Sequence, residues 1–179
     1  LSRVSEWYQQ AAEADAVFFH AYAAQAAVHI AKKEYERAFT IYMSYLERDA
    51  TKAGIYTAIG DVYYNKLNDA KKAKSSFEKE LTINPLNTPV LVRLGYCAYD
   101  DKNYELAKQY AAQALNLKAI DSPALNLMGL SAMGLKDSAQ AKKHFQQAAK
   151  INSYEIPARK NLARMFEING RFEDAKELY

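Results

Sequence analysis

Residues 88–121 read TPVLVRLGYCAYDDKNYELAKQYAAQALNLKAID, and residues 122–155 read SPALNLMGLSAMGLKDSAQAKKHFQQAAKINSYE. Laid over each other without a gap, the two segments place Gly95 on Gly129 and a proline on a proline at the second position. Self-similarity at a fixed period of this length predicts a repeat architecture, in which each unit buries its apolar face by stacking on its neighbours.

The same period continues on both sides of this pair. Five segments of the form Ala-x3-(Tyr, Phe or Ala) recur at this period and begin at Ala38, Ala73, Ala107, Ala141 and Ala175. Only the first interval is longer, by a single residue, and the addition lies between Gly60 and Ala73. Because a turn accepts an insertion and a packed helix does not, we expect the additional residue in the turn around Asn65–Asn68.

These residues resemble the tetratricopeptide repeat (TPR) family, whose 34-residue unit follows the pattern W-x2-L-G-x2-Y…A-x3-F…P. The resemblance covers essentially the whole chain. It implies an all-α fold, a right-handed superhelical solenoid of antiparallel helix pairs, with about five units after a leading half-repeat. We expect a single array over residues 1–179. Its parts are the second helix of a truncated repeat at 1–16, full repeats at 19–52, 53–87, 88–121 and 122–155, and a truncated final repeat at 156–179. Both ends fall inside a repeat, so we expect a fragment of a longer array or ends that a partner covers.

The pattern also predicts the helices. The expected ranges are 1–14, 17–32, 35–48, 52–66, 69–83, 88–101, 104–117, 122–135, 138–151, 155–169 and 172–179. All four prolines fall at boundaries of these helices. Thr88 and Ser122 each precede a proline, which predicts an N-cap followed by proline at the first helical position.

Composition and charge exclude several classes of protein. Half of the 179 residues are apolar, which a disordered tail does not show. Glycine and proline are scarce, with 6 and 4 residues, and this disfavours collagen and turn-rich β folds. No apolar run approaches the roughly 20 residues that a membrane-spanning helix needs. The net charge of +3 is too small to indicate nucleic acid, and the lysines of the second helices interleave with acidic residues, which indicates a solvated charged face.

Side chains that could carry catalysis or bind a metal are few and scattered. The single Cys97 excludes an internal disulfide and a cysteine-built zinc site. We expect a buried thiol there, with a reactive one as the alternative. His20 and His29 are nine residues apart and do not converge as i, i+4 ligands would, and His144 is expected to be solvated beside two lysines. We therefore predict no catalytic residue, no metal and no cofactor.

A binding groove follows from the resemblance, which implies that positions 2, 5, 9 and 12 of each first helix line a concave surface. Helical spacing supports this, because steps of 3, 4 and 3 lie on one face. The predicted groove residues are Thr57, Asp61, Tyr64, Arg93, Tyr96, Tyr99, Asn126, Leu130, Met133, Lys160 and Arg164. The first complete repeat adds a floor of small residues with Ala27 and Ile30. Exposed apolar patches usually mark binding sites, although Tyr96 and Met133 have the alternative of packing against neighbouring helices.

The chain departs from the family pattern at several positions. Some TPR proteins hold a partner's C-terminal carboxylates through a Lys and Asn clamp, but Thr57 and Asp61 stand at two of its positions, which argues against such capture. Position 27 should be small, yet Tyr45 and Glu80 occupy it. For Glu80 we expect a loosened joint or a pairing with a nearby lysine. At the space-filling positions 4, 11 and 24 the chain is expected to follow the pattern, and in the repeat at 122–155 we expect Leu125, Ala132 and Phe145 to fill the space on either side of the helix crossing.

The sequence therefore favours a non-catalytic protein–protein interaction scaffold that binds a partner segment in its groove. By analogy with the family, a bacterial envelope, secretion or pilus-assembly complex is a plausible setting. Alternatives are a region that regulates or docks the catalytic domain of a larger enzyme, a module that self-assembles through uncapped ends, and an RNA-binding repeat. We expect a protein or peptide as the partner and no nucleic acid; cytoplasm and periplasm both stay open.

Overall fold

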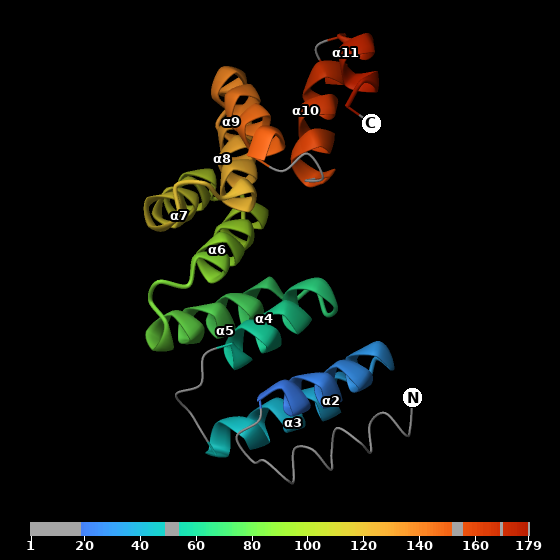
Figure 1. The fold of residues 1–179 in the computed structure, drawn as a ribbon, viewed down its shortest axis with the longest axis vertical. Coiled ribbons are helices and arrows are strands. Elements are labelled where there is room, and N and C mark those ends of the chain that lie inside the picture. The colour runs from blue at the N-terminus through green and yellow to red at the C-terminus, as the bar shows by residue number, and fades with distance from the viewer. Residues whose placement is uncertain (1–18, 49–53, 152–155, 169, 179) are drawn as a thin grey trace. The chain divides into compact units, whose positions relative to one another are not determined.

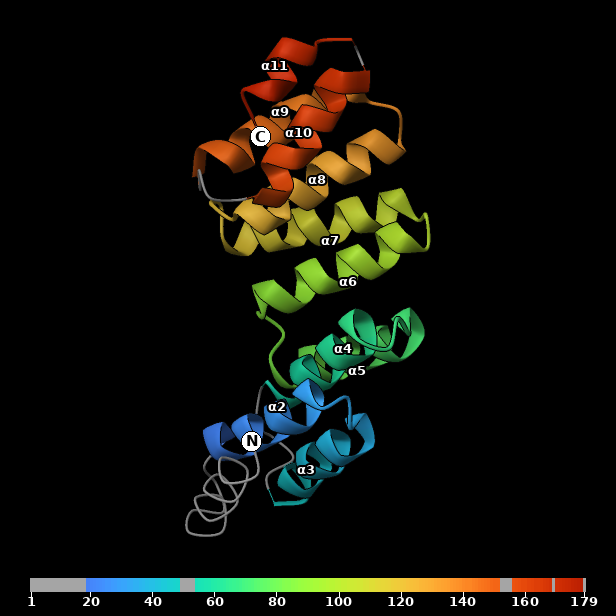
Figure 2. The same cartoon turned by 90° about the vertical axis from the view of Figure 1, so that its right-hand side faces the viewer.

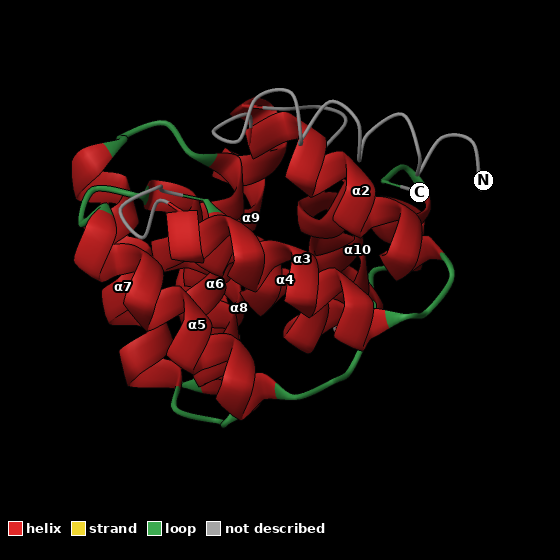
Figure 3. Ribbon diagram, turned by 90° about the horizontal axis from the view of Figure 1, so that it is seen from below, coloured by secondary structure: helices red, strands yellow, loops and turns green. Residues whose placement is uncertain are grey.

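The computed structural model describes residues 19–48, 54–151, 156–168 and 170–178, and every regular element in these ranges is an α-helix (Figures 1 and 3). The helices are α2 (Phe19–Ala31), α3 (Tyr35–Arg48), α4 (Ile55–Asn65), α5 (Ala70–Ile83), α6 (Thr88–Asp100), α7 (Tyr104–Leu117), α8 (Ser122–Gly134), α9 (Ser138–Ile151), α10 (Ile156–Ile168) and α11 (Phe172–Lys176). Their ends lie within three residues of the predicted ones. The helix expected at 1–14 lies outside the described residues.

The chain divides into two compact units, Leu1–Pro85 and Leu86–Tyr179. Within each unit, helices that follow one another in the chain pack together, and in the second unit α8 also contacts α6 and α10 (Figure 2). The first helix of one repeat thus touches the first helices of the repeats before and after it. The prediction of one continuous array concerns how the two units stack, and it stays a prediction.

Glycines of the first helices stand where aromatic rings of the second helices cross them. A Cβ added to Gly60 would lie 2.4 Å from the ring of Phe77, and one added to Gly129 would lie 2.5 Å from the ring of Phe145. Both rings are fully buried. Any larger residue would push the ring off the helix, so the same glycine and aromatic pair holds a repeat together in each unit.

The turns between the two helices of a repeat confirm the predicted insertion. Four of them are three residues long, the one between α10 and α11 included, whereas four residues, 66–69, separate α4 from α5. One residue in each of these turns has a positive φ: Lys33, Asn68, Lys102, Lys136 and Gly170. In a three-residue turn the closing hydrogen bond spans five residues, as from Asn103 N to Ala98 O at 2.8 Å. After α4 it spans six, from Asp69 N to Tyr63 O at 2.9 Å, because the turn absorbs the additional residue.

The prediction of Thr88 and Ser122 as N-caps is wrong by one residue. The caps are Asn87 and Asp121, whose side-chain oxygens accept from the backbone N–H three residues on, at 3.3 and 3.0 Å. An amide or carboxylate oxygen one residue earlier reaches the same orphan donor. Thr88 and Ser122 therefore become the first helical residues, and each proline becomes the second.

Candidate partner-binding surface

A chain of hydrogen bonds crosses three first helices of the second unit. The amide nitrogen of Asn126 on α8 donates to the hydroxyl of Tyr96 on α6 at 2.9 Å. The amide nitrogen of Asn161 on α10 donates to the Asn126 carbonyl oxygen, also at 2.9 Å. Helices α6, α8 and α10 begin three successive repeats, so this one asparagine ties the repeats to each other.

Asn126 does not present its side chain to a partner as predicted, because only 2% of the residue is exposed. A buried amide is tolerated when its groups are hydrogen-bonded, and here both the nitrogen and the oxygen have partners. Its role is to hold the half-buried Tyr96 and Asn161 in fixed orientations beneath the surface that they form.

Two further predicted residues, Tyr99 and Arg164, interact electrostatically. The ring of Tyr99 is half-buried and lies 5.5 Å, centroid to centroid, from the ring of Tyr104. Burial raises the pKa of the Tyr99 hydroxyl, Tyr104 adds to the rise, and the positive charge of Arg164 opposes it. Tyr99 is therefore a neutral phenol at physiological pH, within electrostatic reach of the exposed Arg164 on α10. Lys160, one helical turn before Arg164, is exposed as well.

The other predicted residues of the second unit serve mainly the structure. Met133 and Leu130 are partly buried and pack on the core cluster of Ala132, Ala141, Phe145, Leu162 and Met165, so the packing alternative for Met133 is confirmed. The guanidinium of Arg93 donates to the backbone carbonyl of Pro89, one turn back on the same helix, at 3.3 Å.

In the first unit the predicted residues Thr57, Asp61 and Tyr64 all lie on α4. Asp61 lines a hollow of about 550 Å³ together with Ile30 of α2 and Tyr42 of α3. Burial raises the pKa of Tyr42, and the nearby Asp61 carboxylate raises it further. A second hollow, lined by Ala27 and again by Ile30, adjoins the first, so the small-residue floor expected from the first repeat lies at these hollows.

Glu80 follows neither expectation made from the sequence. The residue is fully buried, and its carboxylate accepts from the backbone N–H of Gly54 at 2.7 Å and of Thr57 at 3.3 Å. The side chain of α5 thus caps the beginning of α4, where Gly54 has no side chain of its own to do so. Glu80, which replaces the family's small residue at position 27, therefore links the two helices of one repeat.

The histidines and the cysteine take different positions. His29 and Glu34 form a hydrogen bond of 2.6 Å, and this bond lowers the pKa of Glu34. His144 is half-buried rather than solvated, and this burial lowers the pKa of its imidazole. Cys97 is 1% exposed, which confirms the buried thiol.

The part of the chain that the structure describes offers neither a metal site nor a membrane span. Among those residues no three His, Cys, Asp or Glu side chains form a group that could hold a metal ion. Likewise, none of the described helices combines the length and the apolar character that crossing a membrane requires.

This arrangement of helices is also found in known proteins. A family model described as tetratricopeptide repeat matches residues 53–85, 88–121 and 122–154, more than half of the chain. The chain belongs to the tetratricopeptide repeat family. The three matched TPR units have the phase predicted from the sequence. No curated protein sequence matches the chain.

Several solved structures are similar to this TPR protein. PilW, a widely conserved type IV pilus biogenesis factor, has a TM-score of 0.78 at 17% identity, over 96% of this chain and 79% of PilW. PilF of Pseudomonas aeruginosa has a TM-score of 0.75 at 24% identity, over 89% of this chain and 72% of PilF. YrrB, a TPR protein with an unusual peptide-binding site, has a TM-score of 0.67 at 25% identity, over 97% of this chain and 89% of YrrB. The predicted all-α TPR solenoid fold is confirmed.

The TPR fold and these neighbours fit a protein-interaction scaffold with protein or peptide partners. TPR proteins are in general non-catalytic interaction modules, and nothing in the comparisons shows an enzymatic activity.

Proposed function

We propose that this TPR protein is a scaffold that binds a segment of a partner protein on the first-helix face of its second unit. We define this face by Tyr96, Tyr99, Asn161 and Arg164, with the buried Asn126 beneath it. The observation that carries the proposal is the hydrogen-bond chain from Tyr96 through Asn126 to Asn161, together with the electrostatic interaction of Tyr99 with Arg164.

The hydrogen-bond chain supports binding because it holds the side chains of this face in fixed orientations before a partner arrives. Side chains that are already held in one orientation lose little entropy on binding. Tyr96 and Tyr99 each offer a large ring with only two rotatable bonds, a combination typical of binding surfaces. The buried amide of Asn126 keeps the first of these rings in place.

The charges of this face suggest the chemistry of the segment. Arg164 and Lys160 are exposed on α10, and a guanidinium binds a carboxylate through two parallel hydrogen bonds. The segment should therefore carry apolar or aromatic side chains over Tyr96 and Tyr99 and an acidic side chain at Arg164.

Affinity capture with the intact protein, followed by titration calorimetry with the captured segment, tests this proposal. Tyr99→Ala should weaken binding about tenfold, as loss of an aromatic anchor does, and Arg164→Ala about fivefold, while circular dichroism shows an intact fold. Arg164→Lys should bind the segment more tightly than Arg164→Ala but less tightly than the wild type, because lysine keeps the positive charge and lacks the two parallel N–H donors of the guanidinium. Lys143→Ala, an exposed change on α9, is the matched control. Unchanged binding in both test variants would refute the site.

More specifically, we propose that this scaffold acts in the assembly of a pilus or of another envelope complex. This proposal is motivated by the neighbours PilF and PilW, the second of which is a type IV pilus biogenesis factor. Captured partners should then be components of such an assembly. Capture of a separate catalytic domain would instead favour the alternative of a docking region for an enzyme.

A further inference from the structure

The eleventh position of the repeat holds residues of very different size. The side chains that surround this position, and the space left between them, differ from one repeat to another. In the repeat at 53–87 this position is Tyr63. Its ring stacks on Phe39 of the preceding second helix, with centroids 4.7 Å apart. The Lys72 ammonium lies 5.3 Å from the centre of the Tyr63 ring, so an aromatic ring here has a neighbour on each side.

The last repeat shows the same arrangement in the second unit. Its eleventh residue is Phe166. The ammonium of Lys142 lies 5.5 Å from the centre of this ring, and the guanidinium of Arg171 lies 4.7 Å from it. Lys142 belongs to the preceding second helix, α9, and Arg171 precedes α11. The ring therefore occupies the notch between consecutive second helices.

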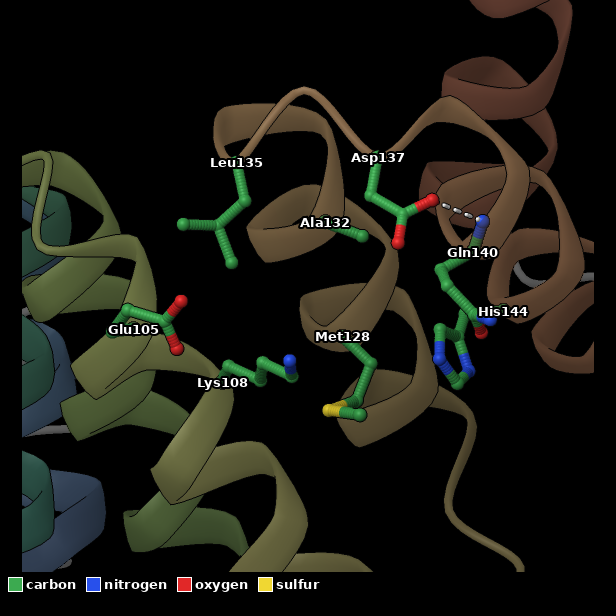
Figure 4. A pocket seen from close by; sticks show the side chains of 8 residues that line it. All are labelled: Glu105, Lys108, Met128, Ala132, Leu135, Asp137, Gln140 and His144. Carbon is green, nitrogen blue, oxygen red and sulfur yellow. Dashed lines mark hydrogen bonds between the residues drawn. The ribbon is translucent and has the colours of Figure 1, made fainter.

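One repeat earlier, the equivalent notch is open. Ala132 stands one full repeat before Phe166, and beside its methyl group lies a pocket of about 520 Å³ (Figure 4). Met128, Ala132 and Leu135 of the α8 region lie between walls from the two second helices. Lys108 of α7 stands on one side, and Gln140 and His144 of α9 stand on the other. The expectation that Ala132 fills this space is wrong, because a methyl group is much smaller than a ring.

One wall of the pocket matches the surroundings of Phe166, whereas on the other side Asp137 stands one full repeat before Arg171 and places a carboxylate there. Lys108 lies one full repeat before Lys142, so the cation that flanks the Phe166 ring has a counterpart in the open notch. On the opposite wall, burial lowers the pKa of His144, and its imidazole is therefore neutral at physiological pH. The carboxylates of Glu105 and Asp137 lie at the edge of the lining as well. The neutral imidazole, the apolar floor and the ammonium group of Lys108 are suited to a ring without charge.

We propose that this pocket is a socket for a phenylalanine- or tyrosine-type side chain carried by a partner polypeptide. The incoming ring would take the place beside Lys108 that the Phe166 ring takes beside Lys142. The socket is built by α7, α8 and α9 and shares no residue with the first-helix face, so it is a second binding site beyond the proposed function.

Nuclear magnetic resonance on the full chain tests the socket, with N-acetyl-phenylalanine methylamide as the probe and its leucine analogue as the comparison. The phenylalanine probe should give saturable shifts of the Lys108, Leu135 and Gln140 amides, with a dissociation constant on the order of 1 mM for a ligand of this size. The leucine analogue should bind about fivefold more weakly, since it lacks the ring that the lysine attracts.

Three variants define the site. Ala132→Phe should fill the socket from within, as Phe166 does, and abolish binding of the probe. Ala132→Leu should fill the socket in part and weaken binding of the probe, and it serves as the test if Ala132→Phe disturbs folding. Lys108→Met should weaken binding about threefold, the usual effect of one exposed cation on a ring. Lys143→Met, a change to an exposed lysine on α9 outside the pocket, is the matched control and should change nothing.

Several results would overturn the socket: no saturable shift at about ten times the expected dissociation constant, equal binding of both probes, or binding that survives both changes at Ala132. Shifts confined to Tyr99 and Arg164 would do the same. Tyr99→Ala should leave binding of the probe intact, so failure of the socket and failure of the first-helix face are distinguishable.

Discussion

The repeats at 53–85 and 122–154 both match the family model, yet they begin their first helices differently. Helix α8 starts after Asp121, which caps its own helix. Helix α4 starts after Gly54, at a φ of 103° and with no side-chain cap. At position 27 the first repeat has the carboxylate of Glu80 bound to Gly54 N, whereas the second has Ala148, whose carbonyl oxygen accepts from Ser122 Oγ at 3.1 Å.

This difference explains why Glu80 replaces the family's small residue at position 27 of the repeat at 53–85. Where an Asn or Asp cap precedes the first helix, as at Asn87 and Asp121, position 27 is Ala114 or Ala148 and is fully buried. Where the cap is absent, the buried N–H groups need another acceptor. A carboxylate reaching across from the second helix of the same repeat then supplies it.

Among the variants that test this comparison, Glu80→Ala should have the largest effect on stability. The change leaves Gly54 N and Thr57 N unpaired and opens a cavity, so the free energy of unfolding should fall by about 3 kcal/mol. Urea denaturation followed by circular dichroism measures this. Glu80→Gln keeps one acceptor oxygen and should lose about half as much. Glu78→Ala, an exposed change on the same helix, should stay within about 0.5 kcal/mol of the wild type; equal losses at positions 78 and 80 would contradict the capping role.

Position 5 gives the next contrast, between Asn126 and Thr57. Asn126→Ala removes both hydrogen bonds of a buried amide and should cost about 2 kcal/mol in the free energy of unfolding. The Thr57 hydroxyl is buried, and within the described residues it has no hydrogen-bond partner. Thr57→Val should therefore be neutral or slightly stabilising. The same denaturation experiment compares them, with Asn116→Ala on the exposed side of α7 as a control; a large loss from Thr57→Val would show that its hydroxyl has a role in the fold.

A smaller effect separates the cap of α8 from its ion pair. Asp121→Ala should cost about 1 kcal/mol, the usual contribution of an N-cap. Asp121 also lies 3.1 Å from the ammonium of Lys118, which is largely exposed, and Lys118→Ala should cost no more than about 0.5 kcal/mol. If the two variants lose the same stability, the ion pair and not the cap is what Asp121 contributes.

The smallest effect depends on pH and concerns the second of the two repeats, because residues 53–85 contain no histidine. Burial lowers the folded-state pKa of His144 from its ordinary value of 6.5. Below that value the unfolded chain binds the proton more readily, so the free energy of unfolding should decrease as the pH falls through 6.5 and level off below the folded-state pKa. Denaturation of the wild type and of His144→Gln between pH 7.5 and 5 measures this; an identical pH dependence in both proteins would exclude His144 as the cause.

Much of the fold follows from the sequence because it depends on local spacing. The period located the glycines that face aromatic rings, and it located the additional turn residue before Asp69. Both are consequences of where a helix must end and which face it buries. The N-caps were missed by one residue because Thr88 and Asn87 both carry a side-chain oxygen that can accept from a backbone N–H, and residue type alone does not decide which of them caps the helix.

What the sequence determined by itself was the phase and pairing of the helices that the structure describes, since these arise from contacts within one hairpin and recur with every repeat of the period. The tertiary structure alone decided the roles of Glu80, Asn126 and Ala132. Each depends on which groups of other helices the fold brings beside it, and a pattern of residue types does not show whether a buried oxygen has its donor or a missing ring leaves a pocket.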